Sequence, residues 1–574
     1  MSPGTPAHLH RSQYLSFFGH LGSVYLFHDL YGFLMQMSPD IVELIDAFAG
    51  GADTAAVNAR FANRFDGATP EQFVDVLVAH QVLLELEPGE DERDGMWPMA
   101  VVKGKWNVWR REGDRVTIWT AWGDAPVQTI ALDADETRMW DAFDGEKRLA
   151  ELRPGFDAAK LRALAERLAH SSVQAIKLSM MPMSTYAKRP QMAPAYLSST
   201  MPYPRWKVGD PVPAASAGVG EIMSPTAYYR DEVQDADAQF DHQETTLSHL
   251  FRIPHPALRG RTYGQALVDT LAARGQIPVQ GTIRVLEIGG GLGYFAKAVA
   301  GALVERGLEV EYRIQELAPA LAAAQRARCA GLPVTVVEGD VLAAEPGDGA
   351  WDLILSNEMV GDLPALQLSR ADVGMELEGI GLPDPAKLVD LGRAGELVLT
   401  LGVQVGDATE PFYLMTGALE LMVRIARWLA PGGTAIVTEF GDRGRWPRLS
   451  THLDHPELST HFAQLEQAAR TLGLATSFEF VIDMIDLDRT QQGLATTRSH
   501  FRALRAMAAA AGVDLAKIGY TPALLAETFG DHLAVAQVGE LRFDRIEDRL
   551  MGLVPHEFKA VIVHRAATPA AGQA

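Results

Sequence analysis

The segment Ile283-Arg-Val-Leu-Glu-Ile-Gly-Gly-Gly-Leu-Gly-Tyr-Phe-Ala296 decides the fold of the C-terminal half of this 574-residue chain. Its apolar start predicts a strand, and the strand leads into a turn that contains Gly289, Gly291 and Gly293. The apolar positions that follow recur at helical spacing. This order brings backbone N–H groups close to a nucleotide-like ligand, because glycine has no Cβ to hold the ligand away.

The same glycines partly fit the dinucleotide fingerprint G-x-G-x-x-G/A. In that fingerprint the first glycine follows the strand directly, so the third small residue would fall on Tyr294, which does not fit. Glu287 is an acid inside an apolar strand, which is unusual for a NAD site. The turn instead resembles motif I of class I S-adenosylmethionine (SAM)-dependent methyltransferases, acid-x-Gly-x-Gly-x-Gly. The resemblance implies that Glu287 and the three glycines bind SAM; a purely structural turn is the remaining alternative.

The composition is that of a globular protein with several domains, with 47% hydrophobic and 22% charged residues. No apolar run is long enough to span a bilayer, and the N-terminus lacks the pattern of a secretion signal. The single cysteine, Cys329, fits a reducing cytoplasm, where we expect the protein to act. The formal charge of −22 repels phosphate backbones. We therefore expect no nucleic-acid partner and favour a cationic or polypeptide one.

Strands and helices alternate downstream of the glycine turn, as a doubly wound α/β sheet requires. The predicted strands span 283–288, 310–316, 334–340, 351–358, 429–438 and 561–564. Glu316 and Asp340 end two of them, where an acid can reach the ribose hydroxyls and the adenine amino group, respectively. Longer connections at 361–417 and 441–478 predict insertions over the site, and segments 501–511 and 521–529 predict a helical insertion.

The segment Asn357-Glu-Met-Val-Gly-Asp-Leu-Pro364 resembles the signature Asn-Glu-x-x-Asp-Ala-Leu-Pro of MidA-like methyltransferases, the group that contains the mitochondrial complex I assembly methyltransferase. Further stretches of this chain agree with that family: 228–229, 263–267, 457–462 and 552–562. The resemblance covers about 225–566, and it implies SAM as cofactor, with Asn357 among its contacts, and methylation of protein arginine nitrogens. One departure is clear: Gly361 stands where the family has aspartate, and Asp362 comes one place later.

A guanidinium acceptor is cationic and planar, so it needs carboxylates that orient the attacking nitrogen. Glu358, at the end of the fourth strand, is our first candidate for this role, with helix capping or ribose binding as the alternative. His461 could act as a base or orient the acceptor, unless it is structural. Asp362 and Asn357 are second candidates for catalysis.

The segment before the fold, which contains Tyr228, Tyr229, His255 and Arg259, is predicted to cover the cofactor site. We expect no metal site. A polar loop around His452 and His455 offers no further ligand at a recognisable spacing, so we predict that its residues lie at the surface.

The N-terminal third contains a faint internal repeat, because Leu44–Gly50 and Met139–Gly145 share the pattern Asp-Ala-Phe-x-Gly. Strand-like segments precede each copy, at 23–27 and 31–35 and again at 115–119 and 127–131. Helix starts follow: Ser38 is a predicted cap, and Asp133 with Glu136 predicts a capping box. Helices are predicted at 54–65, 70–80 and 158–168, with closing apolar segments at 82–85 and 173–178.

This order of elements resembles the PqqD-like winged-helix fold, the recognition element for leader peptides in ribosomal peptide natural-product maturation. In that family the leader adds as an extra strand to the edge of a small sheet. A scaffold for dimerisation or for nucleic-acid binding is the alternative, and the acidic balance weighs against DNA. A homodimer stays possible.

We therefore predict two winged-helix modules (1–95 and 96–180), a Pro-rich linker (181–245) whose aromatic residues dock onto a neighbour, and a methyltransferase domain (246–574). The predicted function is SAM-dependent methylation of a precursor peptide, most readily at an arginine nitrogen. Methylation of a carboxylate or hydroxyl is the alternative within the enzyme class. A non-catalytic assembly factor with a methyltransferase fold is the alternative outside it.

Overall fold

The computed structural model of the protein describes residues 7–20, 23–31, 34–65, 67–86, 92–104, 107–121, 126–170, 172–179, 181–188, 206–211, 222–223, 225–236, 239–240, 246–376, 379–452, 455–488, 498–514 and 558–567. The chain divides into an N-terminal unit, formed mainly by Met1–Ala217, and a C-terminal unit, formed mainly by Gly218–Phe501 and Ala536–Ala574. No helix within the described ranges is long and apolar enough to cross a membrane.

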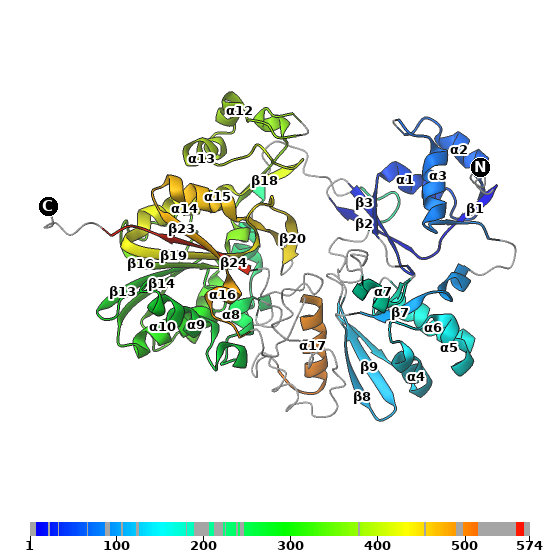
Figure 1. The fold of residues 1–574 in the computed structure, drawn as a ribbon, viewed down its shortest axis with the longest axis horizontal. Helices are drawn as coiled ribbons and strands as arrows, with labels where there is room; N and C mark the ends of the chain where they lie inside the picture. The colour runs from blue at the N-terminus through cyan, green and yellow to red at the C-terminus, as the bar shows by residue number, and fades with distance from the viewer. Residues whose placement is uncertain are drawn as a thin grey trace. The chain divides into compact units, whose positions relative to one another are not determined.

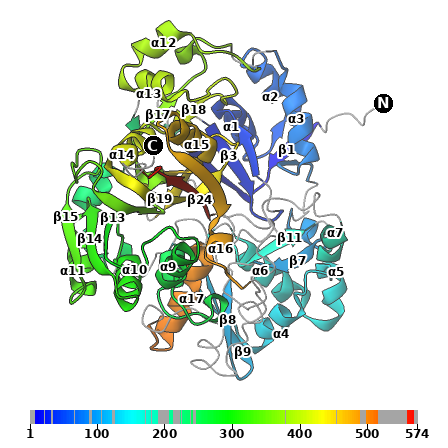
Figure 2. The ribbon, with the colours of Figure 1, turned by 60° about the vertical axis from the view of Figure 1, so that its left-hand side comes forward.

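The N-terminal unit contains two modules whose strands and helices follow the same order, except that an isolated bridge at Arg148 takes the place of β5 in the second. The first has β1 (His8–Arg11), β2 (Leu15–His20), β3 (Ser23–His28), β4 (Leu34–Met37), α1 (Pro39–Asp46), β5 (Ala52–Asp53), α2 (Thr54–Phe61), α3 (Pro70–Ala79) and β6 (Leu83–Leu84). The second has β7 (Ala100–Lys103), β8 (Val108–Glu112), β9 (Arg115–Thr120), β10 (Gln128–Ala131), α4 (Ala134–Ala142), α5 (Leu149–Leu152), α6 (Ala158–Ala169) and β11 (Ile176–Ser179). Figure 2 shows them as a blue and a cyan group.

Strand pairing repeats together with the order of elements. The strands β2-β3-β4 and β8-β9-β10 each form a three-stranded sheet. Strand β1 pairs with β5 and β6, just as β7 pairs with Arg148 and β11. The internal repeat predicted from the sequence is thus confirmed at the level of secondary structure and pairing, although β4 lies further along the chain than the predicted strand 31–35. The likeness to PqqD-like modules stays a prediction.

The predicted helix caps are present in both modules. The Ser38 side chain accepts a hydrogen bond from the backbone N–H of Ile41. In the second module, Asp133 Oδ1 accepts from the backbone N–H of Glu136 at 2.8 Å, and Glu136 Oε2 accepts from that of Asp133 at 3.1 Å. These bonds satisfy N–H groups that the first helical turn leaves unpaired, and they set the start of α1 and α4.

The two modules share an interface within their unit. Tyr14 and Leu30 of the first module are buried in the hydrophobic core of the second. The Tyr14 hydroxyl donates to Glu166 at 2.9 Å. Lys177, on β11, is buried 4.4 Å from the centre of the Phe27 ring, and burial lowers its pKa well below the ordinary value. The modules are therefore distinct in sequence but packed as one body.

Part of the predicted linker packs against the first module. Trp206 is 7% exposed, donates its backbone N–H to the carbonyl oxygen of Phe17 at 2.8 Å, and places its ring edge-on to the Phe17 ring. The prediction that the linker docks is confirmed at this residue. Most of the linker lies outside the described residues.

The C-terminal unit is built on one mixed sheet, with strand order β15-β14-β13-β16-β19-β24-β23. Its strands are β13 (Thr282–Ile288), β14 (Glu309–Glu316), β15 (Val334–Glu338), β16 (Trp351–Asn357), β19 (Leu429–Asp442), β23 (Ala475–Phe480) and β24 (Phe558–His564). The first five in the order are parallel, and β24 runs antiparallel to both of its neighbours. The five parallel strands follow the order 3-2-1-4-5 of a doubly wound sheet, which confirms the predicted doubly wound α/β architecture.

Helices cover both faces of this sheet. Figure 1 shows α9 (Tyr263–Ala273) and α10 (Tyr294–Glu305) on one face, with α14 (Thr416–Trp428) and α15 (Phe462–Thr471) on the other. Residues of α14 and α15 join those of the central strands in the largest described core, which contains Trp428 and Phe462. Such double coverage explains why the central strands are apolar on both sides.

Both predicted insertions are present. The first contains β17 (Ala365–Leu368), α12 (Pro385–Asp390), α13 (Arg393–Leu401) and β18 (Phe412–Leu414), and the second contains the hairpin of β20 (Leu449–His452) and β21 (His455–Leu458). The predicted helix 501–511 is observed as α17 (Arg498–Ala510). The predicted segment 521–529 lies outside the described residues.

The contact between α9 and α10 yields a stability prediction. A Cβ on Gly264 would lie 2.7 Å from the Ala298 Cβ and 3.0 Å from the Val299 backbone nitrogen, whereas a Cβ on Gly301 of the same helix pair would meet nothing within 4 Å. We expect Gly264→Ala to destabilise the C-terminal unit by about 1–3 kcal/mol through overpacking, and Gly301→Ala to be neutral or slightly stabilising. Calorimetric unfolding of the full-length variants measures both; equal melting temperatures would contradict the close contact.

Candidate functional site

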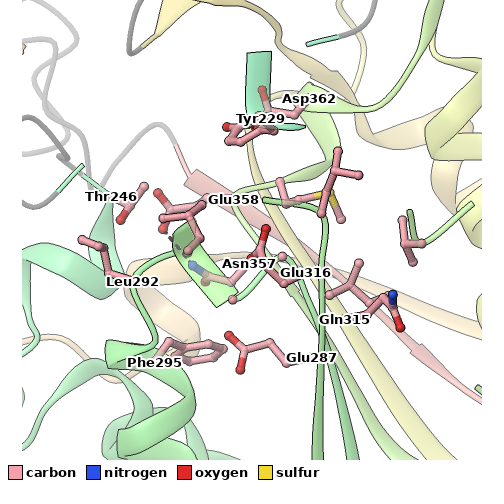
Figure 3. Close-up of a pocket in the computed structure, with 18 of the residues that line it drawn as sticks. Tyr229, Thr246, Glu287, Leu292, Phe295, Gln315, Glu316, Asn357, Glu358 and Asp362 are labelled. Atoms are coloured by element: carbon pink, nitrogen blue, oxygen red, sulfur yellow. Dashed lines mark hydrogen bonds between the residues drawn. The ribbon is translucent and has the colours of Figure 1, made fainter. Parts of the chain in front are cut away.

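A cavity of about 1100 Å³, a volume that includes its opening to solvent, lies at the carboxyl ends of β13, β14 and β16. This is the place where the strand order reverses and where ligands bind in open α/β sheets. Figure 3 shows its acidic side chains. The polar and charged lining side chains are Thr226, Tyr229, Thr246, Ser248, His249, Glu287, Tyr294, Gln315, Glu316, Asp340, Asn357, Glu358 and Asp362.

The glycine turn forms one wall of the cavity, and its backbone requires glycine. Gly289 has φ +70°, and a Cβ there would lie 2.6 Å from the Met359 Cγ. Gly291 has φ +48° with open space where a side chain would stand. Gly293, also predicted to bind the cofactor, does not line the cavity: it precedes α10 in a left-handed conformation and packs against Gln325. The left-handed residues expose the backbone of the turn to a ligand.

Glu287 lies at the floor of the cavity and is 1% exposed. Its Oε2 accepts a hydrogen bond from the Tyr312 hydroxyl at 2.6 Å. Burial, and to a smaller extent the nearby Glu316 charge, raises the pKa of Glu287 to about 8, against the effect of the tyrosine bond. A buried acid of this kind gains most from a bound cation, which would favour its charged form.

Glu316 is held by donors on two sides. Its Oε1 accepts from the backbone N–H of Ala318 at 3.0 Å and its Oε2 from Gln325 Nε2 at 2.7 Å. Burial raises its pKa, while these bonds and one from the Gly290 backbone oppose the shift. These donors hold the Glu316 side chain in one orientation at the cavity wall.

Asp340 comes two residues after the end of β15 and also lines the cavity. Its Oδ1 accepts from the backbone N–H of Leu342 at 2.8 Å. Gln315 beside it is tied to the Gly339 carbonyl oxygen at 2.9 Å. These bonds hold the strand end in one conformation.

Asn357 and Glu358 form a connected pair at the end of β16. Asn357 Oδ1 accepts from the hydroxyls of Tyr263 at 2.9 Å and Thr438 at 3.0 Å, and its Nδ2 donates to Glu358 Oε1 at 3.2 Å. Glu358 Oε1 also accepts from the backbone N–H of Leu247 at 3.0 Å. Asn357 thus orients Glu358, as Figure 3 shows.

Glu358 has φ +53°, a left-handed conformation that is uncommon for a residue other than glycine. Such strain persists where the surroundings over-determine a residue, and it clusters at functional sites. The hydrogen bonds from Asn357 and Leu247 supply those surroundings.

Tyr229, Asp362 and His455 form a third connected group. The sequence predicted Tyr229 and Asp362 near the site but not His455. The Tyr229 hydroxyl donates to Asp362 Oδ2 at 2.7 Å, and His455 Nε2 lies 3.0 Å from Asp362 Oδ1. His455 is 1% exposed, so the prediction that it lies at the surface is wrong: the hairpin turns its ring inward. It is separated from Asp362 by 93 residues, and no sequence pattern joins the two.

The other predicted residues lie elsewhere. His461 is the residue before α15, is 7% exposed and places its ring edge-on to Trp446, and it does not line the cavity. Burial lowers its pKa. His255 caps a short turn by accepting from the backbone N–H of Ala257, and Arg259 pairs with Asp486. The pre-fold segment nevertheless lines the cavity, through Tyr229, Thr246 and His249 among others.

Among the described residues no group of three or more histidine, cysteine or acidic side chains could hold a metal ion.

No protein-family model matches the sequence, and no curated protein matches it. Some solved structures resemble parts of the chain at low similarity. A COG1565 superfamily protein from Burkholderia thailandensis bound to S-adenosyl-homocysteine is 17% identical (TM-score 0.33, covering 59% of this chain and 82% of that one). A S-adenosylmethionine-dependent methyltransferase from Mesorhizobium loti is 14% identical (TM-score 0.25, 52% and 98%). At such values they carry no argument about activity.

Burial of Glu287 predicts a pH-dependent stability. Its pKa is about 8 in the folded protein against an ordinary 4.5, so the folded state holds this proton more tightly than the unfolded chain. Its contribution to the free energy of unfolding is therefore lost as pH rises from about 4.5 to about 8. Glu287→Gln cannot ionise, so we expect it to be more stable than the wild type by on the order of 4 kcal/mol near pH 8, with little difference near pH 4.5.

Calorimetric unfolding of both proteins across this pH range measures the difference. Glu305→Gln, at an exposed glutamate of α10, is the control and should follow the wild type. Parallel curves for Glu287→Gln and the wild type would contradict the assigned burial.

Proposed function

We propose that this protein is a SAM-dependent methyltransferase that modifies a peptide side chain, with an arginine nitrogen as the acceptor. One observation carries the proposal. A single cavity at the switch point of a class I methyltransferase sheet joins a glycine turn and buried acids to the carboxylates of Glu358 and Asp362.

The residues at the glycine turn and at the ends of β14 and β15 suit the chemical groups of SAM. The left-handed Gly289 and Gly291 let a ligand approach the backbone. Glu316 can accept from ribose hydroxyls and Asp340 from an adenine amino group. SAM is cationic, and the buried Glu287 offers a charge that becomes favourable when such a cation binds. Among the residues predicted from the sequence, Gly293 supports the turn from outside the cavity.

The carboxylates of Glu358 and Asp362 favour a cationic acceptor. A guanidinium presents N–H donors in a planar fork, which carboxylates bind in pairs. When bound, SAM supplies an electrophilic methyl group, and the carbon–sulfur electron pair stays on sulfur as the carbon–nitrogen bond forms. The acceptor nitrogen loses one proton for each methyl group it gains. Glu358 or Asp362 can accept that proton, and His461, outside the cavity, is assigned no contact with the acceptor.

The N-terminal unit supports capture of a peptide by strand addition. Strand β10 ends its sheet, and Leu132 just after it donates its backbone N–H to Val116 of β9. Because N–H directions alternate along an antiparallel strand, those of Thr129 and Ala131 point away from β9. An extended peptide can bond to that edge.

Binding of S-adenosyl-homocysteine tests the cofactor. By titration calorimetry on the full-length protein, Glu316→Ala should weaken binding roughly tenfold to hundredfold, because a charged hydrogen-bond acceptor is lost. Glu338→Ala is the matched control, since Glu338 also ends a strand but does not line the cavity. A wild-type protein that binds no S-adenosyl-homocysteine would favour the assembly-factor alternative.

The acceptor class is tested with small probes on the protein saturated with S-adenosyl-homocysteine. N-acetyl-arginine amide should bind at least about tenfold more tightly than the neutral, equally shaped N-acetyl-citrulline amide. Glu358→Gln should abolish the preference. Tighter binding of N-acetyl-aspartate amide would instead favour methylation of a carboxylate.

A proline substitution tests peptide recognition by the second module. Ala131→Pro removes an outward N–H of β10, with little expected loss of stability at an edge. After co-expression with a short precursor peptide encoded beside the gene, mass spectrometry should show less methylation for this variant than for the wild type. Unchanged methylation would exclude strand addition at this edge.

A further inference from the structure

Packing around residues 361 and 362 decides which of the two can carry a side chain that faces the cavity. A Cβ on Gly361 would lie 2.5 Å from the carbonyl oxygen of Leu458 and 3.1 Å from the Glu457 Cγ, both on β21. The Gly361 backbone N–H is already bonded to Glu439 Oε2 at 3.0 Å. No side chain fits at residue 361 while the hairpin is in place. The next residue, Asp362, is the one that faces the cavity.

Both oxygens of Asp362 are held, each by a different segment. Tyr229, from the segment before the fold, donates to Oδ2 at 2.7 Å. His455, from the hairpin after β19, contacts Oδ1 at 3.0 Å. The Asp362 side chain keeps 13% exposure, while that of His455 has none. The carboxylate therefore faces the cavity, and the histidine lies behind it.

The ring of His455 is itself fixed. Tyr228 stacks on it with ring centres 4.6 Å apart and planes at 30°. Tyr229 meets it edge-on at 5.0 Å, in addition to bonding to the same carboxylate. Two adjacent tyrosines thus pack on the ring of His455, and His455 in turn contacts the carboxylate of Asp362. A side chain positioned by packing and hydrogen bonds on this scale is pre-organised for a ligand, because little conformational freedom is left to lose on binding.

We propose that the β20–β21 hairpin completes the acceptor site: His455 and Tyr229 are positioning residues that aim Asp362, which binds the cationic acceptor together with Glu358. The inference rests on the proposed methyltransferase function and names the second carboxylate of its acceptor site. The displacement of the acid from residue 361 to residue 362 follows from the hairpin, which fills the first position and supplies the histidine for the second.

The test uses the full-length protein saturated with S-adenosyl-homocysteine and titrated with N-acetyl-arginine amide. Asp362→Asn, His455→Ala and Tyr229→Phe should each weaken binding of the probe roughly tenfold, the loss expected for one charge-assisted hydrogen bond. Affinity for S-adenosyl-homocysteine should stay within about twofold of the wild type. His455→Gln should recover most of the loss, because the glutamine amide can replace the Nε2 donor.

His564→Ala is the control, since this histidine is exposed at the end of β24. Tyr229→Phe keeps the ring and loses only the hydroxyl, so it decides the question if His455→Ala does not fold. Probe affinity unchanged in Tyr229→Phe and Asp362→Asn would overturn the inference. A wild-type protein that binds S-adenosyl-homocysteine but not the probe would refute the arginine acceptor and this inference together, whereas unaffected variants refute the inference alone.

Discussion

Strand β13 is hydrogen-bonded to β14 on one side and to β16 on the other, and the functional half of the molecule depends on that placement. The connections that leave the carboxyl ends of the neighbouring strands β13 and β16 run in opposite directions, so they diverge and open a crevice. The glycine turn, Glu316 at the end of β14 and Asn357 at the end of β16 all line it. Their convergence is a property of the sheet and not of any one loop.

The crevice concentrates acids that water would otherwise solvate. Burial raises the pKa of Glu287 to about 8 and raises that of Glu316 as well. Donors compensate both: a tyrosine hydroxyl for Glu287, and a backbone N–H and the Gln325 amide for Glu316. A cavity with these buried acids is costly when empty and attractive to a cation, which is the charge that SAM and a guanidinium share.

The N-terminal unit follows a different principle. Its modules repeat one order of strands and helices, yet each is completed by the other, through Tyr14 in the second core and Lys177 beside Phe27. Small modules bury too little apolar surface to be very stable alone. Their pairing leaves β4 and β10 as sheet ends, where a peptide can add.

The sequence by itself determined the elements. The spacing of apolar residues and the positions of capping and glycine residues predicted the strands, the capped helices at Ser38 and Asp133 and the glycine turn. These features depend on neighbours a few residues apart. Motif order also predicted which acids end the strands. The sequence did not predict the partner of Asp362, because His455 lies 93 residues further along the chain in a polar hairpin that was predicted to be at the surface.

Tertiary structure alone decided which side chains meet. It placed His461 against Trp446 and outside the cavity, and it removed Gly293 from the ligand wall. It brought Tyr229 to Asp362, and it left no room for a side chain at residue 361. Local sequence fixes conformation through short-range sterics and hydrogen bonds. The composition of a site depends on packing between distant segments, which no local pattern encodes.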